Sequence, residues 1–429
     1  MKVKTTTVKS KSVRKLIVGY DISKFKHNYY SNFNDNNLCN EIEGVVSSSR
    51  KELNCHFLEL RKLADKHGYS TIVVACEPTG GYEKSFINLA RVHGFFVKYV
   101  SGEATSKFKV IETNDSGKND IKDARVIFSL ATQEKTLECR ELKGVYSRLN
   151  QLNRSYERMS LDKSRAKTIF STILDGFFPS LHVKSSKYYN KTFKCIVEEF
   201  KLNPYKIAKI PLDEFEDIIQ LAYKRKLSKA SKAIITLVWE KASSYKESEV
   251  DLFYIEESEG LIEYYYGQIK SLEKMKEMYK LRMVELYSQT KEYGRLKKVP
   301  VSDFLMSRVI SEAGPLGDFD CIEKLMRYAG LNLKERSSGT YVGKVKISKK
   351  GNVLLRKILG QVTFASFTKE VTGFGKVYHR KKEVRGGYYA LTCIMRKALK
   401  MIFGVYKSKE EFQLERMLNQ NPIIKEDVA

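Results

Sequence analysis

The chain has 429 residues, of which 77 are Lys or Arg and 51 are Asp or Glu, so its formal net charge is +26. This excess predicts a polyanionic partner, and nucleic acid is favoured over a membrane. No apolar run approaches the roughly 18–20 residues that a membrane-spanning helix needs, and the basic start, Met1 to Lys15, lacks the apolar segment of a signal peptide, which favours a cytoplasmic protein.

The cysteines also limit the kinds of site that the chain can contain. None forms a C-x-x-C pair, and no His lies at zinc-finger spacing from one. We therefore predict reduced, mostly buried thiols and no structural zinc. The residues concerned are Cys39, Cys55, Cys76, Cys139, Cys195, Cys321 and Cys393.

The first third of the chain alternates predicted strands with predicted helices. Strands are expected at 16–21, 25–33, 71–76 and 95–100, and helices at 37–68, 83–93 and 119–133. The first two strands form a hairpin, and Gly68 is a plausible helix C-cap. The alternation predicts an α/β domain over residues 12–145, after a basic tail at 1–11.

Residues 146–295 have a helical pattern, interrupted near Gly176–Pro179, at Pro204 and at Pro211. Within a predicted helix at 256–290, apolar residues recur at alternating spacings of three and four. They are Leu261, Tyr265, Leu272, Met275, Tyr279 and Leu286. This pattern fits a coiled coil with another helix, and equally a helix that packs inside its own bundle. The run Lys224-Arg225-Lys226 is interpreted as a solvated basic face.

The third region, residues 296–408, is compact and very basic, and a polar tail follows at 409–429. Its predicted helices lie at 304–312, 322–328, 353–368 and 388–406. Between the second and third of these, Ser337-Ser338-Gly339 lies in a loop rich in Gly and Ser. Turn chemistry alone favours a flexible loop there over a reactive serine.

Four carboxylates are distinguished by their positions. Asp21 ends the first strand, Glu77 follows the strand at 71–76, and Asp120 and Asp123 lie three apart on one helix face. Taken singly, each acid is more simply a turn or capping residue. Together they predict a site for two divalent cations, because crowded carboxylates repel one another unless a cation neutralises them. Two such ions can stabilise the attacking and leaving oxygens of a phosphodiester exchange.

Three strings that carry these acids resemble a known family. Val18-Gly-Tyr-Asp-Ile-Ser-Lys24, Glu77-Pro-Thr-Gly-Gly-Tyr82 and Lys118-Asn-Asp-Ile-Lys-Asp-Ala124 are similar to the acidic blocks of DEDD transposases. These enzymes belong to a bacterial, bridge-RNA-guided insertion-sequence family related to Piv-type DNA invertases. The C-terminal strings that resemble the family are Phe319, 322–328, Gly330-Leu331, Ser337–Gly339, Gly343–Asn352, Leu355-Arg356, Tyr378–Lys382 and Gly387–Arg396.

The resemblance implies an α/β plus α fold class. It comprises an N-terminal RuvC-like, ribonuclease-H-type mixed sheet with helices, a long helical middle, and a mostly helical C-terminal transposase domain. It also implies that Asp21, Glu77, Asp120 and Asp123 bind Mg²⁺, two ions per site. The family's DNA nucleophile, a Ser before Gly, corresponds to Ser338, and Ser337 remains the alternative. The implied partners are double-stranded donor and target DNA, a structured guide RNA and further copies of the chain as a dimer or tetramer. The implied location is the nucleoid of a bacterial cytoplasm.

Basic residues of the third region are expected to contact phosphates. They are Lys344, Lys346, Lys349, Lys350, Arg356, Arg380, Lys381 and Lys382. Two departures from the family stand out. Val299-Pro-Val-Ser-Asp303 keeps the Pro but lacks the glycines of the family's turn, and residues 175–250 have no equivalent, which predicts a helical insertion.

The leading hypothesis is therefore a transposase that excises and integrates an insertion sequence by serine attack on DNA. One rival is a RuvC-like junction resolvase or nuclease that uses the same acids with water as nucleophile. Another is a non-catalytic nucleic-acid-binding scaffold.

Overall fold

The computed structural model describes residues 14–35, 38–113, 120–181, 190–245, 252–334, 337–338, 341–343, 345–369 and 373–408. The chain divides into two compact units, Met1–Glu141 and Leu142–Ala429. Each unit is considered by itself below.

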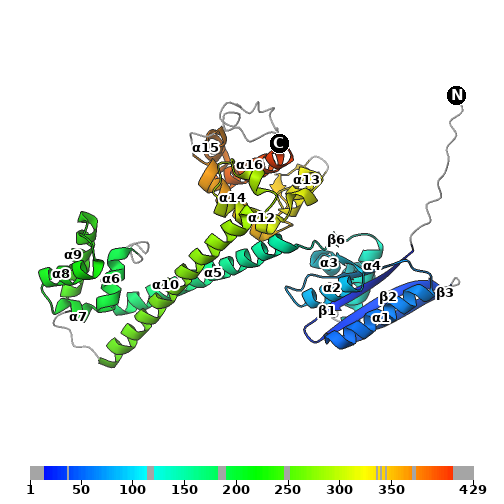
Figure 1. Ribbon diagram of the computed structural model, residues 1–429, viewed down its shortest axis with the longest axis horizontal. Helices are drawn as coiled ribbons and strands as arrows, with labels where there is room; N and C mark the ends of the chain where they lie inside the picture. The colour runs from blue at the N-terminus through cyan, green and yellow to red at the C-terminus, as the bar shows by residue number, and fades with distance from the viewer. Residues whose placement is uncertain are drawn as a thin grey trace. The chain divides into compact units, whose positions relative to one another are not determined.

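The first unit is built on a six-stranded mixed sheet in the order β3-β2-β1-β4-β5-β6 (Figure 1). Its strands are β1 (Lys15–Ile22), β2 (Lys26–Asp35), β3 (Leu38–Ser47), β4 (Thr71–Cys76), β5 (Phe96–Tyr99) and β6 (Leu137–Glu138). β1, β4 and β5 run parallel, while β2, β3 and β6 pair antiparallel with their neighbours. The mixed α/β fold expected for this region is confirmed, and it is consistent with a ribonuclease-H-like domain.

The helices of this unit are α1 (Arg50–Lys66), α2 (Glu83–Val92), α3 (Gly102–Thr113) and α4 (Asp120–Thr132). Along each central strand, alternate side chains enter different cores. Leu16, Val18 and Tyr20 of β1 pack with α1 and α2, as do Ile72, Val74 and Cys76 of β4. Ile17 and Ala75, which have the opposite parity, pack with α3 and α4. One face of the sheet therefore carries α1 and α2, and the other carries α3 and α4.

The prediction of a single helix over residues 37–68 is wrong in its first part. Residues 38–47 form strand β3, which pairs with β2, and the helix α1 begins only at Arg50. The apolar positions Leu38, Ile42 and Val46 are four apart, a spacing that suits one helical face and equally one strand face. Ser49 caps α1 by accepting a hydrogen bond from the amide of Glu52.

A buried aromatic cluster around His56 makes the first unit sensitive to acid. The Tyr20 hydroxyl lies 2.9 Å from His56 Nε2, and burial, together with the charge of nearby His27, lowers the pKa of His56 to about 4. Because the unfolded chain then binds a proton more readily than the folded one, stability falls as pH falls from about 6.5 towards 4. The loss attributable to His56 is about 3 kcal/mol at pH 4, since one pKa unit corresponds to about 1.4 kcal/mol.

We expect His56→Gln to remove that component. Urea unfolding of wild type and variant, followed by circular dichroism at pH 8, 6 and 4, measures it. The variant should lose about 3 kcal/mol less stability than wild type between pH 8 and pH 4. Equal losses in the two proteins would show that His56 is not the group that titrates.

The second unit is organised around two long antiparallel helices, α5 (Gly144–Phe177) and α10 (Leu252–Ser288), which lie side by side (Figure 1). The end of α5 and the start of α10 share one core with a four-helix group. That group is α6 (Lys191–Phe200), α7 (Pro204–Ala208), α8 (Leu212–Tyr223) and α9 (Lys229–Ser243). The start of α5 and the end of α10 share another core with the C-terminal helices.

The predicted seam of α10 is correct only in part: Leu286 is buried and Tyr265 packs against a core. Leu261 and Met275 are exposed, while Ile262, Tyr266 and Ile269 are buried against α5 and the four-helix group. The sequence places Tyr, Leu and Ile around most of the circumference of this helix, so periodicity alone could not select the buried stripe. Within the described residues, α10 packs on α5 of its own chain, which is the bundle alternative.

Pro204 and Pro211 act as expected. Pro204 is the first residue of α7, and Pro211 is the N-cap of α8. The Lys224–Lys226 run between α8 and α9 is exposed, as expected for a solvated face.

The C-terminal group contains several helices and, among the described residues, two short strand pairings, β7 with β10 and β8 with β9. Its elements are α11 (Tyr293–Leu296), α12 (Asp303–Ala313), η2 (Leu316–Asp318), α13 (Ile322–Tyr328), β7 (Leu333–Lys334), β8 (Ser337–Ser338), β9 (Tyr341–Val342), β10 (Lys346–Ile347), α14 (Val353–Phe367), α15 (Gly373–Arg385) and α16 (Gly387–Lys407). The four helices expected here are confirmed as α12, α13, α14 and α16, whereas α15 and the short strands were not foreseen. The polar tail at 409–429 lies outside the described residues.

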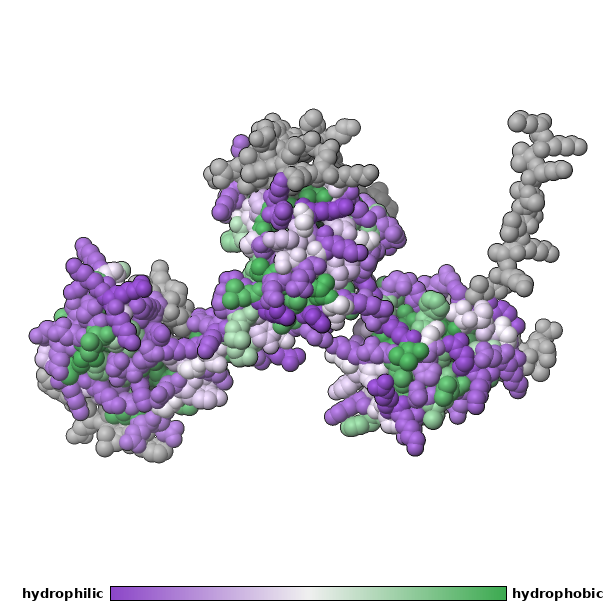
Figure 2. Space-filling view, in the orientation of Figure 1, coloured by the Kyte–Doolittle hydropathy of each residue, from purple (hydrophilic) through white to green (hydrophobic). Residues whose placement is uncertain are grey.

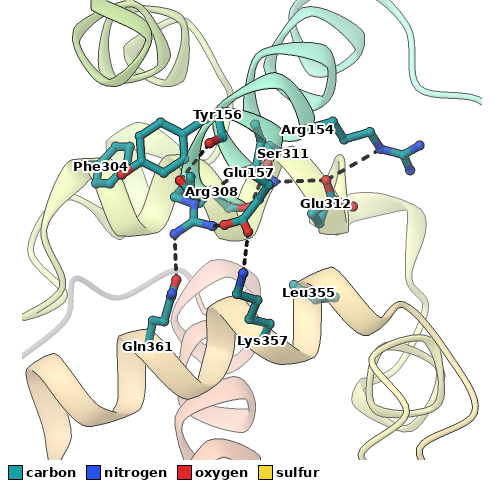
Figure 3. A network of polar contacts seen from close by, with 12 residues as sticks. Arg154, Tyr156, Glu157, Phe304, Arg308, Ser311, Glu312, Leu355, Lys357 and Gln361 are labelled. Atoms are coloured by element: carbon teal, nitrogen blue, oxygen red, sulfur yellow. Dashed lines mark hydrogen bonds and ion pairs between the residues drawn. The ribbon is translucent and has the colours of Figure 1, made fainter. Parts of the chain in front are cut away.

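A polar network fastens α5 to α12 and α14 (Figure 3). Arg308 of α12, only 3% exposed, donates to Asn153 Oδ1 at 3.0 Å and forms an ion pair with Glu157, both on α5. Arg308 also donates to Gln361 of α14 at 2.6 Å, and Lys357 reaches Glu157 at 2.5 Å. Three helices from distant parts of the sequence are therefore joined through one buried guanidinium.

A second buried acid, Glu312, extends this network by one helical turn. Its carboxylate accepts hydrogen bonds from Asn150 and Asn153 of α5 and from Asn352, the N-cap of α14, each at 3.0 Å. Three donors satisfy a charge that would otherwise be costly to bury.

The thiols differ in part from expectation. Of the cysteines with described side chains, Cys76 and Cys195 are buried, Cys55 is exposed and the others are half-buried, so "mostly buried" is wrong. All of these are free thiols.

Among the described residues, none of the helices combines the length and the apolar composition that a membrane span requires. Figure 2 shows that hydrophilic residues cover most of the visible face of each unit.

Candidate functional site

Asp21 and Glu77 lie at the same edge of the first unit's sheet. β1 and β4 are parallel neighbours and Tyr20 pairs with Cys76, so the next step of the register brings Asp21 beside Glu77. Ile17, Gly19 and Ala75 face α3 and α4. Asp21 lies an even number of residues after Ile17 and Gly19, and Glu77 lies two residues after Ala75, so both acids are on this same face of the sheet. Both side chains are half-buried. The two strands therefore deliver two carboxylates to one face of one sheet edge.

Gly19 allows α4 to approach this face closely. A Cβ at Gly19 would lie 2.4 Å from the Ala124 carbonyl oxygen and 2.5 Å from the Phe128 amide nitrogen, both in the backbone of α4. No side chain could fit there without moving the helix. Because Asp123 directly precedes Ala124, this contact brings its helical turn next to β1, the strand that carries Asp21.

Glu77 is held by the first turns of α3. The Thr105 hydroxyl, which is buried, donates a hydrogen bond to Glu77 Oε1. Glu77 Oε2 lies 3.2 Å from the position that a Cβ of Gly102 would occupy. The carboxylate thus lies against the N-terminal turn of a helix, where the helix dipole favours negative charge.

The loop after Glu77 is held by a different acid. Glu83, 5% exposed, accepts hydrogen bonds from the Thr79 hydroxyl and the Gly81 amide, each at 2.8 Å. Burial alone would raise the pKa of the Glu83 carboxyl, but these hydrogen bonds lower it below its ordinary value. Glu83 therefore remains ionised and fixes the Pro-Thr-Gly-Gly turn that follows Glu77.

Asp123 forms an ion pair with Lys109 of α3, and each side chain is about three-quarters buried. Among the described residues, Asp123 Oδ1 accepts no hydrogen bond of regular geometry, so the ammonium is its counter-charge. A buried carboxylate oxygen that is balanced by a cation is chemically suited to a hard divalent ion.

The four-acid set is brought together only in part. Asp21, Glu77 and Asp123 lie on the face of the sheet that α3 and α4 cover, and Asp120 is the first residue of α4, with only its backbone described. Within the described residues, no three His, Cys, Asp or Glu side chains are grouped closely enough to hold a metal ion. The carboxylate donors fit Mg²⁺ in their chemistry, and their joint ligation remains a prediction.

Ser337 and Ser338 form strand β8 rather than a loop. β8 pairs antiparallel with β9, with Ser338 opposite Tyr341 and Ser337 opposite Val342. Separate substitutions at the two positions distinguish their roles.

The expected phosphate contacts differ in how available they are. Lys346, Lys350, Arg380 and Lys382 are exposed, and Lys349 is exposed beside the Tyr388 ring, 5.9 Å from its centroid. Two others are partly engaged in the fold.

Lys381 lies 5.6 Å from the centroid of the Tyr389 ring. Arg356 donates at 3.1 Å to the Ala329 carbonyl, so it stabilises the turn at Gly330. Lys344 lies outside the described residues.

Three residues beside the acids were missed from the sequence. Thr105 and Lys109 were missed because α3 itself was not predicted, although Glu103 and Lys107 form an i, i+4 pair typical of a helix surface. Asn28 is buried and is the cross-strand partner of Asp21, on the same face. The sequence did contain a signal for Asn28: it is a polar residue in the second strand of the predicted hairpin, seven positions after Asp21.

The chain was compared with known proteins. Residues 18–179 match a family model described as a transposase, of the DEDD type found in IS110 elements. Residues 295–379 match a second one, described as the transposase IS116/IS110/IS902 family. No curated protein matches the chain. α6–α9 lie between the two matched segments.

Proposed function

From a chain that carries two transposase domains of the IS110 family, we propose an enzyme that cuts and rejoins DNA to excise and integrate an insertion sequence. The family domains support a DNA transposase or recombinase as the general activity. The metal site, the serine nucleophile and the guide RNA are the finer parts of the proposal.

In this proposal Asp21, Glu77, Asp120 and Asp123 hold divalent cations, with Mg²⁺ as the preferred ion. When bound, the ions supply positive charge that stabilises the oxygens of a phosphodiester undergoing exchange. The protein's own part is to fix the ligands: Thr105 orients Glu77, and the close packing at Gly19 positions the turn that carries Asp123.

Ser338 is proposed as the nucleophile. Its Oγ forms a bond to phosphorus while the bond from phosphorus to one deoxyribose oxygen breaks. The hydroxyl loses its proton, and the departing deoxyribose oxygen gains one. The reverse step, with a deoxyribose hydroxyl of the new strand attacking the phosphoserine, rejoins DNA without an external energy source. The acids and Ser338 belong to different units, so the proposal requires the two units, of one chain or of two copies, to meet on DNA.

One observation carries the proposal furthest. Asp21 of β1, Glu77 directly after β4 and Asp123 of α4 lie on the same face of a mixed sheet, in a chain whose matched domains are transposases. The net charge of +26 supports partners with many phosphates, both DNA and a structured RNA. Guidance by that RNA is inferred from the family resemblance.

Trapping of a covalent adduct tests the nucleophile. The protein, with its copurified RNA and Mg²⁺, is incubated with end-labelled DNA carrying the sequences that flank the gene, then denatured and run on a gel. Wild type should leave a labelled band that survives denaturation and disappears on protease treatment. Ser338→Ala should lower that band by at least about 100-fold, because no other group replaces the hydroxyl as nucleophile.

Ser337→Ala is the matched control, since it makes the same change one residue away in the same strand. It should retain the adduct. Loss of the adduct in Ser337→Ala alone would transfer the role to Ser337. Cut DNA without any adduct in wild type would favour the nuclease reading, in which water attacks. Strand exchange retained in an Asp120→Ala, Asp123→Ala double variant would overturn the metal-site proposal.

A further inference from the structure

One helix, α3, contacts two of the proposed metal ligands. The Thr105 hydroxyl donates to Glu77, and the Lys109 ammonium pairs with Asp123. Thr105 and Lys109 are four residues apart and therefore lie on the same face of the helix. Neither residue belongs to the acidic blocks on which the metal site was proposed.

The two contacts differ in kind. Thr105 supplies a neutral hydrogen bond, which can persist when Glu77 binds a cation through its other oxygen. Lys109 supplies a full positive charge to Asp123 Oδ1, the atom that is buried and accepts no regular hydrogen bond from a described residue. A divalent ion bound at that oxygen would meet an ammonium at close range, and two cations on one carboxylate oxygen repel each other.

We propose that Lys109 is the resident counter-ion of the metal-free site, and that a divalent cation must displace its ammonium from Asp123 in order to bind. The proposal rests on the metal site of the proposed function. It explains how converging acids stay folded without metal, because Lys109 offsets their mutual repulsion. It also makes the released ammonium available to a DNA phosphate only when the metal is bound.

Binding of Mn²⁺ to the metal-stripped, full-length protein tests this, measured by isothermal titration calorimetry. Lys109→Met should bind Mn²⁺ about tenfold more tightly than wild type, because no ammonium has to leave, and tenfold corresponds to about 1.4 kcal/mol. Lys109→Arg keeps the charge and should stay within about threefold of wild type. The metal-free Lys109→Met protein should melt roughly 5 °C lower than wild type, and added Mn²⁺ should reverse that loss.

Lys107→Met is the matched control. Lys107 lies on the same helix and pairs with Glu103 at 2.8 Å, but its side chain is 72% exposed. This variant should leave both the Mn²⁺ affinity and the melting temperature as in wild type, since exposed pairs contribute little.

The possible results separate the two proposals. Mn²⁺ binding that Glu77→Gln abolishes, but that Lys109→Met leaves unchanged, would overturn the counter-ion role alone and leave Lys109 as a structural ion pair. Mn²⁺ binding that Glu77→Gln does not alter would overturn the metal site, and the inference about Lys109 with it.

Discussion

Asp21→Asn is expected to lower the rate of DNA strand cleavage by at least about 100-fold. The change keeps the size of the side chain and removes one negative charge at the strand end where Asp21 and Glu77 lie side by side. A metal site with one carboxylate fewer loses a ligand, and with it charge stabilisation of the kind whose removal costs about 10²–10³ in rate. Cleavage of labelled DNA under single-turnover conditions measures the effect.

Asp65→Asn provides the control. Asp65 is an exposed residue of α1, which packs on the opposite face of the same sheet, and the chemical change is identical. Its cleavage rate and melting temperature should match those of wild type. If Asp21→Asn cut DNA at the wild-type rate, the first strand would not contribute to the active site.

A lower rate caused only by unfolding is distinguished by the melting temperature without metal. Asp21 lies beside the like charge of Glu77, so replacing it with a neutral amide should leave metal-free stability unchanged or slightly raised. Added Mn²⁺ should then stabilise the variant less than it stabilises wild type.

The strand-end acids were predictable because β-sheet geometry depends on short-range sequence patterns. Apolar runs mark β1 and β4, and an acid follows each run: Asp21 is the next-to-last residue of β1, and Glu77 comes directly after β4. Their adjacency needs only the parallel pairing that an α/β alternation implies. Gly19 could not be interpreted in the same way, because its role depends on α4, which is distant in sequence.

The counter-charge of Asp123 and the buried network around Arg308 could not be predicted from the sequence, for a different physical reason. Lys109 and Arg308 resemble the many other basic residues of the chain, and only tertiary packing distinguishes them. Similarly, a spacing of four at Leu38, Ile42 and Val46 suited helix and strand alike, so the local pattern could not decide. In each case the missing information was a contact between elements far apart in the sequence.

Arg308→Met is expected to destabilise the second unit by about 3–5 kcal/mol. The substitution preserves apolar volume but leaves Glu157 with Lys357 alone, and it removes the donors to Asn153 Oδ1 and Gln361 Oε1. Breaking one side of a buried charge pair has this cost because the remaining charge stays desolvated. Arg282→Met, which breaks an exposed pair with Glu285 on α10, should cost less than about 1 kcal/mol.

The loss should be concentrated where Arg308 joins three helices. The single Trp, Trp239, belongs to the other core of this unit, so its fluorescence would not report the change. Hydrogen–deuterium exchange is therefore the suitable measurement, with faster exchange expected in α12, α14 and the first half of α5 and unchanged exchange in α6–α9. Uniformly faster exchange would contradict a local role.

A second substitution separates the ion pair from simple packing. If the charge pair is responsible, Arg308→Met combined with Glu157→Leu should be less destabilised than the sum of the two single variants, because no buried charge is then left uncompensated. Strict additivity would mean that the guanidinium contributes through its contacts with Tyr156 and Phe304 instead. Since β8 lies in the same unit as this network, a loosened α12–α14 packing should also weaken the Ser338-dependent adduct, while the Mn²⁺ affinity of the first unit stays at its wild-type value.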